Sequence, residues 1–203
     1  AVTFLEPEDH DPSKNKLRSC GKPGYGAEIR IEDENGKDLA VGEVGEIVIK
    51  SDNNMKGYWN NPKATEESVV DGWFYSGDAG YFDEDGFLYI HDRVKDMIVS
   101  GGENIYPAEV ENALMSHDDI LDAAVVGIPD EKWGETVKGF VVLKEGVELK
   151  EEEIISYART QIAGFKCPKS INYVSELPRN PSGKILRKDL RAPYWEGKDR
   201  NIS

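Results

Sequence analysis

The chain has 203 residues, with 25 basic and 39 acidic side chains and a formal net charge of -14, which argues against non-specific binding to nucleic acid or to an anionic membrane surface. The mean hydropathy of -0.57, the lack of an apolar run of membrane-spanning length and a start without a signal-peptide pattern make the cytoplasm the default location. Neither a disulfide framework nor a metal site is expected. The cysteines and histidines are scattered at Cys20, Cys167, His10, His91 and His117.

Residues 1–91 are predicted to be mainly β, because short stretches that alternate apolar and charged side chains are separated by turns. Asn61 followed by Pro62 is typical of a helix N-terminus and predicts one short helix that ends near Val70. The predicted strands are 27–32, 46–50, 73–74, 80–82 and 87–90, with turns at 33–36 and 83–86.

From residue 97 onward strands alternate with helices, which predicts a second, small α+β domain over residues 97–203. Pro107 opens one amphipathic helix, and a second over residues 151–163 is expected to stop at Gly164. The inward positions of these helices are Val110, Ala113, Leu114, Ile154, Ile155, Ala158 and Ile162. The predicted strands are 97–99, 123–128, 137–143 and 170–174, and a short terminal helix is predicted at 185–190.

A densely charged segment, residues 92–96, connects the two predicted domains. Such a segment stays in water and lets two domains rotate passively. It can equally be a functional hinge, and the sequence pattern leaves both interpretations open.

The segment around Lys184 stands out because it places one lysine on a stiff loop. Pro178 and Pro181 fix φ ahead of it, and Gly183 permits a left-handed turn or a close approach to a ligand. Residues 166–191 hold seven basic and two acidic side chains, an excess of five positive charges in an acidic chain. A small polyanion, above all a phosphate, is the natural partner. The alternative is a solvated basic helix end.

A series of motifs runs along most of the chain, at residues 45–47, 55–59, 75–78, 92–98, 100–111 and 181–185. In order and spacing these motifs resemble the last motifs of the adenylate-forming (AMP-binding) ligases, a superfamily that includes acyl-CoA synthetases, coumarate-CoA ligases, luciferase and peptide-synthetase adenylation domains. Residues 96–111, 127–135 and 178–181 are most similar to the bacterial long-chain fatty-acyl-CoA synthetases.

The resemblance implies a mixed fold in two parts. Residues 1–91 would be the mainly-β distal part of the large adenylation domain, residues 92–96 a hinge, and residues 97–203 a mobile α+β C-terminal lid domain. The family's Ser/Thr/Gly-rich phosphate loop and its Tyr-Gly-x-Thr-Glu segment are absent. We therefore expect a fragment that is largely inactive alone and that partners the remainder of its parent domain. Residues 201–203 resemble a natural chain end.

The implied reaction joins a carboxylic acid, here a fatty acid, to coenzyme A in two steps. The carboxylate first attacks the α-phosphate of ATP to give an acyl-adenylate and pyrophosphate, and the thiol of coenzyme A then displaces AMP. Mg²⁺ would accompany the nucleotide without being held by this fragment.

Three residues are implied to serve the first step. Asp78 would accept hydrogen bonds from the ribose hydroxyls, since an ionised carboxylate is a pure acceptor. Arg93 would help to hold the ribose and phosphate end. Lys184 would be the catalytic cation between the attacking carboxylate and the α-phosphate. The alternative for Asp78 is an ordinary turn residue after Gly77.

The second step is implied to depend on movement of the lid. Lys95 occupies the hinge position, and Gly101 and Gly102 would let the pantetheine arm of coenzyme A pass close to the backbone. Lys166 and Lys169 would contact the phosphates of coenzyme A. Residues 100–104 can otherwise be an ordinary hairpin loop. Trp133 and Tyr106 are expected to be packing residues.

Two further functions stay open on this evidence. The chain could be a non-catalytic module that binds nucleotide or coenzyme A or docks a carrier protein. It could also be part of a peptide-synthetase adenylation domain.

Overall fold

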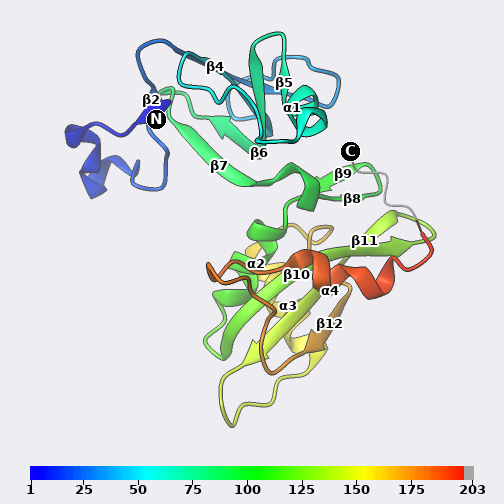
Figure 1. Ribbon diagram of the computed structural model, residues 1–203. Coiled ribbons are helices and arrows are strands. Elements are labelled where there is room, and N and C mark those ends of the chain that lie inside the picture. Colours follow the sequence, from blue (N-terminus) through cyan, green and yellow to red (C-terminus); the bar gives the residue numbers. More distant parts are fainter. Residues whose placement is uncertain (199–203) are drawn as a thin grey trace. The chain divides into compact units, whose positions relative to one another are not determined.

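The computed structural model describes residues 1–198, which form two compact units (Figure 1). The first unit is Ala1–Val94 and the second begins at Lys95. The described residues form mainly sheets with four α-helices, which confirms the mixed fold class. The natural end expected at residues 201–203 lies outside the described residues.

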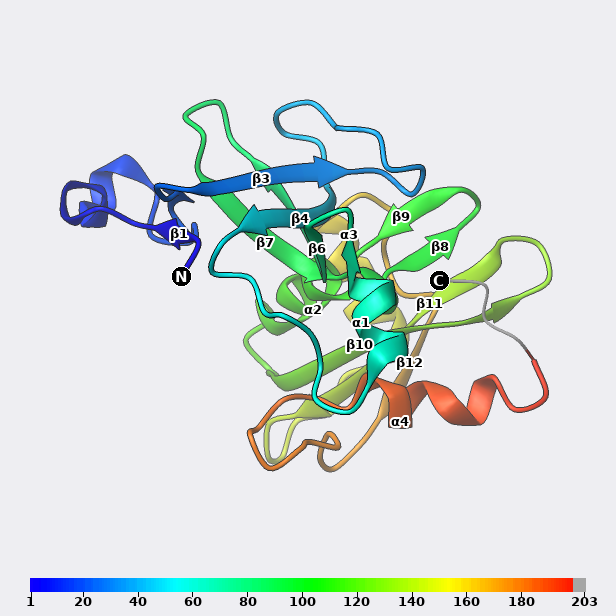
Figure 2. The same cartoon turned by 45° about the horizontal axis from the view of Figure 1, so that its top comes forward.

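The first unit is built on a five-stranded sheet of order β3-β4-β6-β5, with β7 added beside β6 (Figure 2). All of these strand pairs are antiparallel. The sequence predicts two short strands, 73–74 and 80–82, where the structure has one long strand, β6. A bulge interrupts the regular pairing between these two parts without ending the strand. The strands are β3 (Ala27–Glu32), β4 (Gly45–Ser51), β5 (Val69–Val70), β6 (Trp73–Phe82) and β7 (Leu88–Arg93), preceded by β1 (Thr3–Phe4), η1 (Pro7–His10), η2 (Pro12–Lys14) and β2 (Lys22–Pro23).

Helix α1 (Pro62–Ser68) begins as predicted, with Asn61 Oδ1 accepting a hydrogen bond from the Ala64 amide at 3.2 Å. Its predicted end near Val70 is wrong, because Val69–Val70 form β5 and pair with Phe74 and Trp73. Asp71 and Gly72, with φ of 50° and 82°, make the two-residue turn that favours a tight hairpin. β-branched valines also suit the strand better than the helix.

The charged segment 92–96 is not a free linker. Asp92 and Arg93 are the last residues of β7, and Val94–Asp96 form the 3-10 turn η3. The boundary between the two units falls inside this turn, between Val94 and Lys95. Bending at this point stays a prediction.

The second unit contains a five-stranded sheet of order β10-β11-β8-β9, in which β12 runs parallel to β11. Strand β9 was not predicted: it pairs with β8 across Gly101 and Gly102, so the predicted loop is the tip of a hairpin. The strands are β8 (Ile98–Ser100), β9 (Glu103–Ile105), β10 (Ile120–Asp130), β11 (Gly134–Leu143) and β12 (Ser170–Tyr173).

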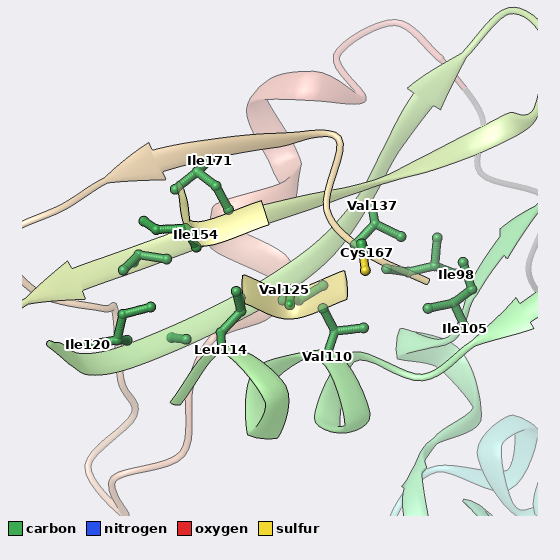
Figure 3. Packing of buried hydrophobic residues seen from close by; sticks show 13 residues of the cluster. Ile98, Ile105, Val110, Leu114, Ile120, Val125, Val137, Ile154, Cys167 and Ile171 are labelled. Carbon is green, nitrogen blue, oxygen red and sulfur yellow. The ribbon is translucent and has the colours of Figure 1, made fainter. Parts of the chain in front are cut away.

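Helices α2 (Pro107–Met115) and α3 (Glu151–Gln161) cover one face of this sheet. Val110 and Leu114 of α2 and Ile154 of α3 are fully buried against β10 and β11 (Figure 3). Each fully buried Leu or Ile contributes about 1.5–3 kcal/mol, so α2 is a fixed platform for its polar side chains. Helix α3 ends at Gln161, not at Ala163, because Ile162 is extended and packs against the core.

The opposite face of the sheet is also buried, under the C-terminal segment. Alternate residues of β10 and β11 point to this side, where Leu177 is buried and Ile185, Leu190 and Tyr194 are partly buried against them. Helix α4 (Arg187–Arg191) begins later than predicted, because Ile185 forms a β-bridge with Arg179. The turn η4 (Ala192–Tyr194) follows it. The Lys184 loop is therefore mounted directly on the sheet.

Candidate active site

Two of the predicted nucleotide ligands are in direct contact in the first unit. Asp78 on β6 lies opposite Arg93 on β7, and Arg93 Nε is 2.8 Å from Asp78 Oδ1. The side chain of Asp78 is 29% exposed and that of Arg93 is 48% exposed. An ion pair this exposed contributes roughly 0–1 kcal/mol to stability, so both groups remain able to engage a ligand.

A bulge in β6 sets the direction of Asp78. Between the pairs Glu46–Ala79 and Val48–Tyr75, strand β4 has one residue and β6 has three, residues 76–78. Gly77 within the bulge has φ of 70°, which a side chain would strain. Bulges beside active sites commonly re-aim a side chain, and this one places Asp78 beside Arg93.

Two residues without an assigned role in the sequence prediction hold the bulge. Ser76 Oγ donates to Ile47 O at 2.7 Å and accepts from the Asp78 amide at 3.1 Å. Glu46 Oε1 accepts from the Gly77 amide at 3.0 Å. Both residues lie within recognised motifs, but neither motif indicates that residue 46 contacts residue 77.

The surroundings of the bulge are acidic. Burial raises the pKa of Glu46, and the nearby carboxylates of Glu32 and Asp78 act in the same direction, while the hydrogen bond from Gly77 opposes the rise. Tyr75 donates its hydroxyl proton to Glu32 Oε2 at 3.3 Å. This region offers acceptors to a ligand rich in hydroxyl groups, and Arg93 supplies a cation beside them.

Asn180 organises the Lys184 loop from within. Its backbone N–H donates to Lys184 O at 2.9 Å, and its carbonyl accepts from the Gly183 amide at 2.8 Å. Its Oδ1 accepts from the Lys184 amide at 2.9 Å and from the amide and hydroxyl of Ser182. Gly183 has φ of 83°. The loop is thus stiffened by Asn180 as well as by the prolines that the sequence indicated.

The ammonium group of Lys184 differs from its basic neighbours. The Lys184 side chain is exposed, and within residues 1–198 no carboxylate lies in ion-pair distance of it. Lys166 and the three arginines of residues 166–191 are paired with carboxylates, whereas Lys169 and Lys188 are exposed outside the loop, so Lys184 is the exposed charge that the loop itself presents. The neutralised pairs are Lys166–Glu109, Arg179–Asp122, Arg187–Glu111, Arg187–Asp96 and Arg191–Asp96.

The tip of the β8–β9 hairpin holds the glycines predicted to face coenzyme A. Gly101 and Gly102 have φ of 65° and 87°, and the Gly101 amide donates to Trp133 O at 2.8 Å. A Cβ on Gly101 would come within 2.7 Å of Trp133 Cε3, whereas the space around Gly102 is open. Trp133 is 46% exposed, while Tyr106 is buried and packs as expected.

The remaining candidates are three lysines predicted to serve the second step, Lys166, Lys169 and Lys95. Lys166 Nζ contacts both carboxylate oxygens of Glu109 at 2.8 Å, so a phosphate would have to compete with Glu109. Lys169 and Lys95 are exposed. The hinge and coenzyme A assignments therefore stay predictions.

Across residues 1–198, no three His, Cys, Asp or Glu side chains are grouped so as to hold a metal ion. None of the helices in that range has the length and apolarity to cross a membrane. Both cysteines are free, and burial raises the pKa of the Cys167 thiol.

Comparison with known proteins identifies the family. Residues 1–59 match the model of the AMP-binding enzymes, and residues 109–184 match that of the AMP-binding enzyme C-terminal domain. The chain belongs to the AMP-binding, adenylate-forming enzyme family. The second match ends at Lys184, and Asp78 and Arg93 lie between the two matched ranges. The roles of all three residues stay predictions.

Curated relatives of the AMP-binding chain are ligases of different acids. It is 42% identical to a fatty acid–[acyl-carrier-protein] ligase of Streptomyces coeruleorubidus, 49% to a 2-succinylbenzoate–CoA ligase of Geobacillus kaustophilus and 44% to a long-chain-fatty-acid–CoA ligase of Mycobacterium tuberculosis. These alignments cover 98%, 94% and 90% of the chain. The chain spans only 36–38% of the length of these relatives.

Solved structures of o-succinylbenzoate CoA synthetase from Bacillus subtilis have the same fold. The complex with the acyl-adenylate intermediate matches all of this chain and 39% of its own, with 42% identity and a TM-score of 0.83. The complex with ATP and magnesium ion matches 93% of this chain and 38% of its own, with 42% identity and a TM-score of 0.81.

Proposed function

We propose that this chain is the distal part of an ATP-dependent acid–thiol ligase that works in the cytoplasm. The observation that carries the proposal is the exposed Lys184 ammonium, held on an ordered loop whose flanking arginines, Arg179 and Arg187, are already paired with carboxylates. The Asp78–Arg93 pair supplies the matching ribose site. Similarity to acid–CoA and acid–carrier ligases over at least 90% of the chain supports the same reaction class.

In the proposed first step, an oxygen of the substrate carboxylate attacks the α-phosphorus of ATP, and the bond to pyrophosphate breaks. Asp78 accepts hydrogen bonds from the ribose hydroxyls. Arg93 orients the Asp78 carboxylate and also faces the phosphate end of the nucleotide. Lys184 stabilises the negative charge that accumulates as the new bond forms. A fixed cation acts more strongly on this transition state than on the separated anions.

In the proposed second step, the thiol of coenzyme A attacks the acyl carbonyl carbon, and AMP leaves. The lid turns about Lys95, and the hairpin tip at Gly101 and Gly102 then borders the pantetheine arm. Lys166 contacts a phosphate of coenzyme A in exchange for Glu109. Mg²⁺ travels with ATP and is held mainly by the nucleotide and by residues outside this chain.

A fatty acid is the proposed substrate. Two of the similar ligases are named for fatty acids, although 2-succinylbenzoate appears in the name of another that is 49% identical. The acyl pocket is assigned to the part of the relatives that this chain does not cover. The 203-residue chain is accordingly proposed to be largely inactive without that part.

The decisive experiment measures pyrophosphate release by the full-length gene product with ATP, coenzyme A and carboxylic acids of increasing chain length. Acid-dependent release, followed by acyl-CoA formation, is expected, with the highest kcat/KM for long-chain acids. Activity with 2-succinylbenzoate and with none of the fatty acids would make 2-succinylbenzoate the proposed substrate in place of a fatty acid. Absence of release with every acid would contradict the ligase function.

A non-catalytic binding module is the second candidate, because the exposed Lys184 ammonium and the exposed Asp78–Arg93 pair are suited to binding a nucleotide without chemistry. Intact-mass analysis of the natural gene product separates the two functions. A product near the mass of the relatives supports the ligase. A product of about 22.7 kDa that binds ATP or coenzyme A in calorimetry without releasing pyrophosphate supports the module.

A further inference from the structure

The Lys184 loop is fastened to the sheet by an arginine on each side. On the N-terminal side, Arg179 Nη2 pairs with Asp122 Oδ2 on β10 at 2.6 Å, and Arg179 Nη1 donates to Gly183 O at 2.6 Å. On the C-terminal side, Arg187 lies three residues beyond Lys184 and pairs with Glu111 of α2. Both fastenings reach the region of β10 over which the loop lies.

The Arg187 fastening is the more rigid of the two. Arg187 Nε and Nη2 donate to the two carboxylate oxygens of Glu111 at 2.9 and 2.6 Å, a bidentate geometry that fixes orientation as well as distance. Glu111 Oε1 also accepts from the Val125 amide of β10 at 2.9 Å. The side chains of Arg187 and Glu111 are 17% and 7% exposed, against 42% and 24% for Arg179 and Asp122.

Arg187 also reaches the start of the second unit. Its Nη1 is 3.6 Å from Asp96 Oδ2, and Arg191 Nη1 is 3.5 Å from Asp96 Oδ1. Asp96 immediately follows the predicted hinge residue, Lys95. One guanidinium group thus connects the segment after Lys184, helix α2 and the residue next to the predicted hinge.

We propose that Arg187 is the positioning residue of Lys184: its forked contact with buried Glu111, shared with Asp96, fixes the loop so that the catalytic ammonium moves with the lid as one rigid body. This inference rests on the proposed function of Lys184. Arg187 has no role in contacting substrate, because both edges of its guanidinium are engaged by carboxylates of this chain.

The test uses Arg187→Met alone and together with Glu111→Gln in the full-length protein. The single variant leaves a buried carboxylate unpaired, which destabilises the fold. In the double variant neither charge remains, and the new glutamine side chain can still accept from the Val125 amide. We expect the double variant to regain the melting temperature lost by the single one. Adenylation should nevertheless stay roughly 10–100-fold low, while thioester formation from supplied acyl-adenylate is unchanged.

Hydrogen exchange of the 203-residue chain gives a second readout that does not depend on activity. The Gly183 and Lys184 amides are hydrogen-bonded to Asn180, so a peptide that contains them should exchange faster in the double variant. Tyr157→Phe is the matched control, because it removes a hydrogen bond to Ser116 O in the same unit and should leave this peptide unchanged.

Four outcomes separate the inference from the proposed function. Recovery of adenylation together with stability in the double variant would overturn the positioning role, as would unchanged exchange at Gly183 and Lys184. Faster exchange with persistently low adenylation supports it. If the wild-type full-length protein forms no adenylate, the ligase function fails, and the exchange measurement alone decides whether Arg187 holds the loop.

Discussion

The Asp78 and Lys184 sites share one local design and differ in charge compensation. In each, the charged residue directly follows a glycine with left-handed φ, 70° at Gly77 and 83° at Gly183. In each, the glycine's amide is hydrogen-bonded. Asp78, however, already has a cationic partner in Arg93, whereas Lys184 has no carboxylate partner within residues 1–198.

The difference follows from what each group is proposed to bind. Ribose hydroxyls are neutral donors, so a carboxylate can keep its arginine and still accept from them. A phosphate must be attracted by net positive charge, and a lysine that was already paired would offer little. The two sites therefore suit chemically different groups, hydroxyls at Asp78 and a phosphate at Lys184, which makes their responses to substitution distinguishable.

Removing Lys184 should give the largest effect. Lys184→Ala is expected to slow adenylation by about 100-fold or more, because a preorganised charge is lost from the transition state. Thioester formation from supplied acyl-adenylate should be much less affected. The unfolding free energy should stay within about 0.5 kcal/mol, since the side chain is exposed. Separate assays of the two half-reactions in the full-length protein, with thermal unfolding, measure all three.

Lys188→Ala is the matched control, since Lys188 is another exposed lysine four residues further along the chain. It should leave both half-reactions unchanged. Equal loss of both half-reactions in Lys184→Ala would contradict the proposed role of Lys184.

Asp78→Asn should have the next largest effect and should act on ATP binding. Loss of a hydrogen bond to a charged group is worth about 1.5–3 kcal/mol, so kcat/KM for ATP is expected to fall roughly 10–100-fold. Stability should fall by less than about 1 kcal/mol, because the pair with Arg93 is exposed. The ATP dependence of pyrophosphate release measures the effect. Asp85→Asn, which changes another exposed carboxylate of this unit, is the control. An equal loss of kcat/KM for ATP in Asp85→Asn would contradict the proposed role of Asp78.

Local signals in the sequence predicted Lys184 and most of the elements around both sites, whereas the role of Asp78 was implied only by the resemblance to the adenylate-forming ligases. Alternation of apolar residues indicated β3 and β4, and the Asn61–Pro62 cap indicated the start of α1. The Lys184 loop could be predicted because Pro178, Pro181 and Gly183 all lie within a few residues of Lys184, whereas the role of Asn180 follows from its hydrogen bonds in the structure. In such cases the determinants of the structure are neighbours in the chain.

The supports that were missed depend on contacts between distant residues. Glu46 and Gly77 are 31 residues apart, and Glu111 and Arg187 are 76 apart. Nothing in either local pattern indicates that these residues meet, because strand pairing and helix packing bring them together. Strand β9 was missed because Glu103 and Asn104 are exposed polar residues beside two glycines, a pattern that favours a loop, and only pairing with β8 makes them a strand.

Lys95→Pro should have a moderate effect that is confined to one step. Proline fixes φ near -65° and removes the amide hydrogen, so a turn that must change conformation is frozen. We expect thioester formation to slow by about tenfold, equivalent to about 1.4 kcal/mol of barrier, with adenylation less affected. Lys95→Ala, which removes the charge but leaves the backbone free, is the control. Preserved thioester formation in the proline variant would rule out the hinge.

Glu46→Gln should have the smallest effect and reports on the acidic side of the comparison. Because the pKa of Glu46 is raised above its ordinary value of 4.5, the folded protein binds more protons at this site than the unfolded chain does. Stability therefore falls as pH rises through the window above 4.5. Glutamine keeps an acceptor for the Gly77 amide and removes the charge, so this fall should disappear.

At pH 8 the unfolding free energy of the Glu46→Gln variant is expected to exceed that of the wild type by about 1 kcal/mol or less. Its melting temperature should then rise by at most about 2–4 °C. Glu28→Gln, an exposed carboxylate on the neighbouring strand β3, should leave the pH profile unchanged. If Glu46→Gln instead melts lower at every pH, the Gly77 bulge needs the full negative charge. In that case the hydrogen bond from the Gly77 amide to the Glu46 carboxylate stabilises the fold by more than the repulsion between Glu46 and Asp78 destabilises it. The negative charge of Glu46 would then stabilise the bulge.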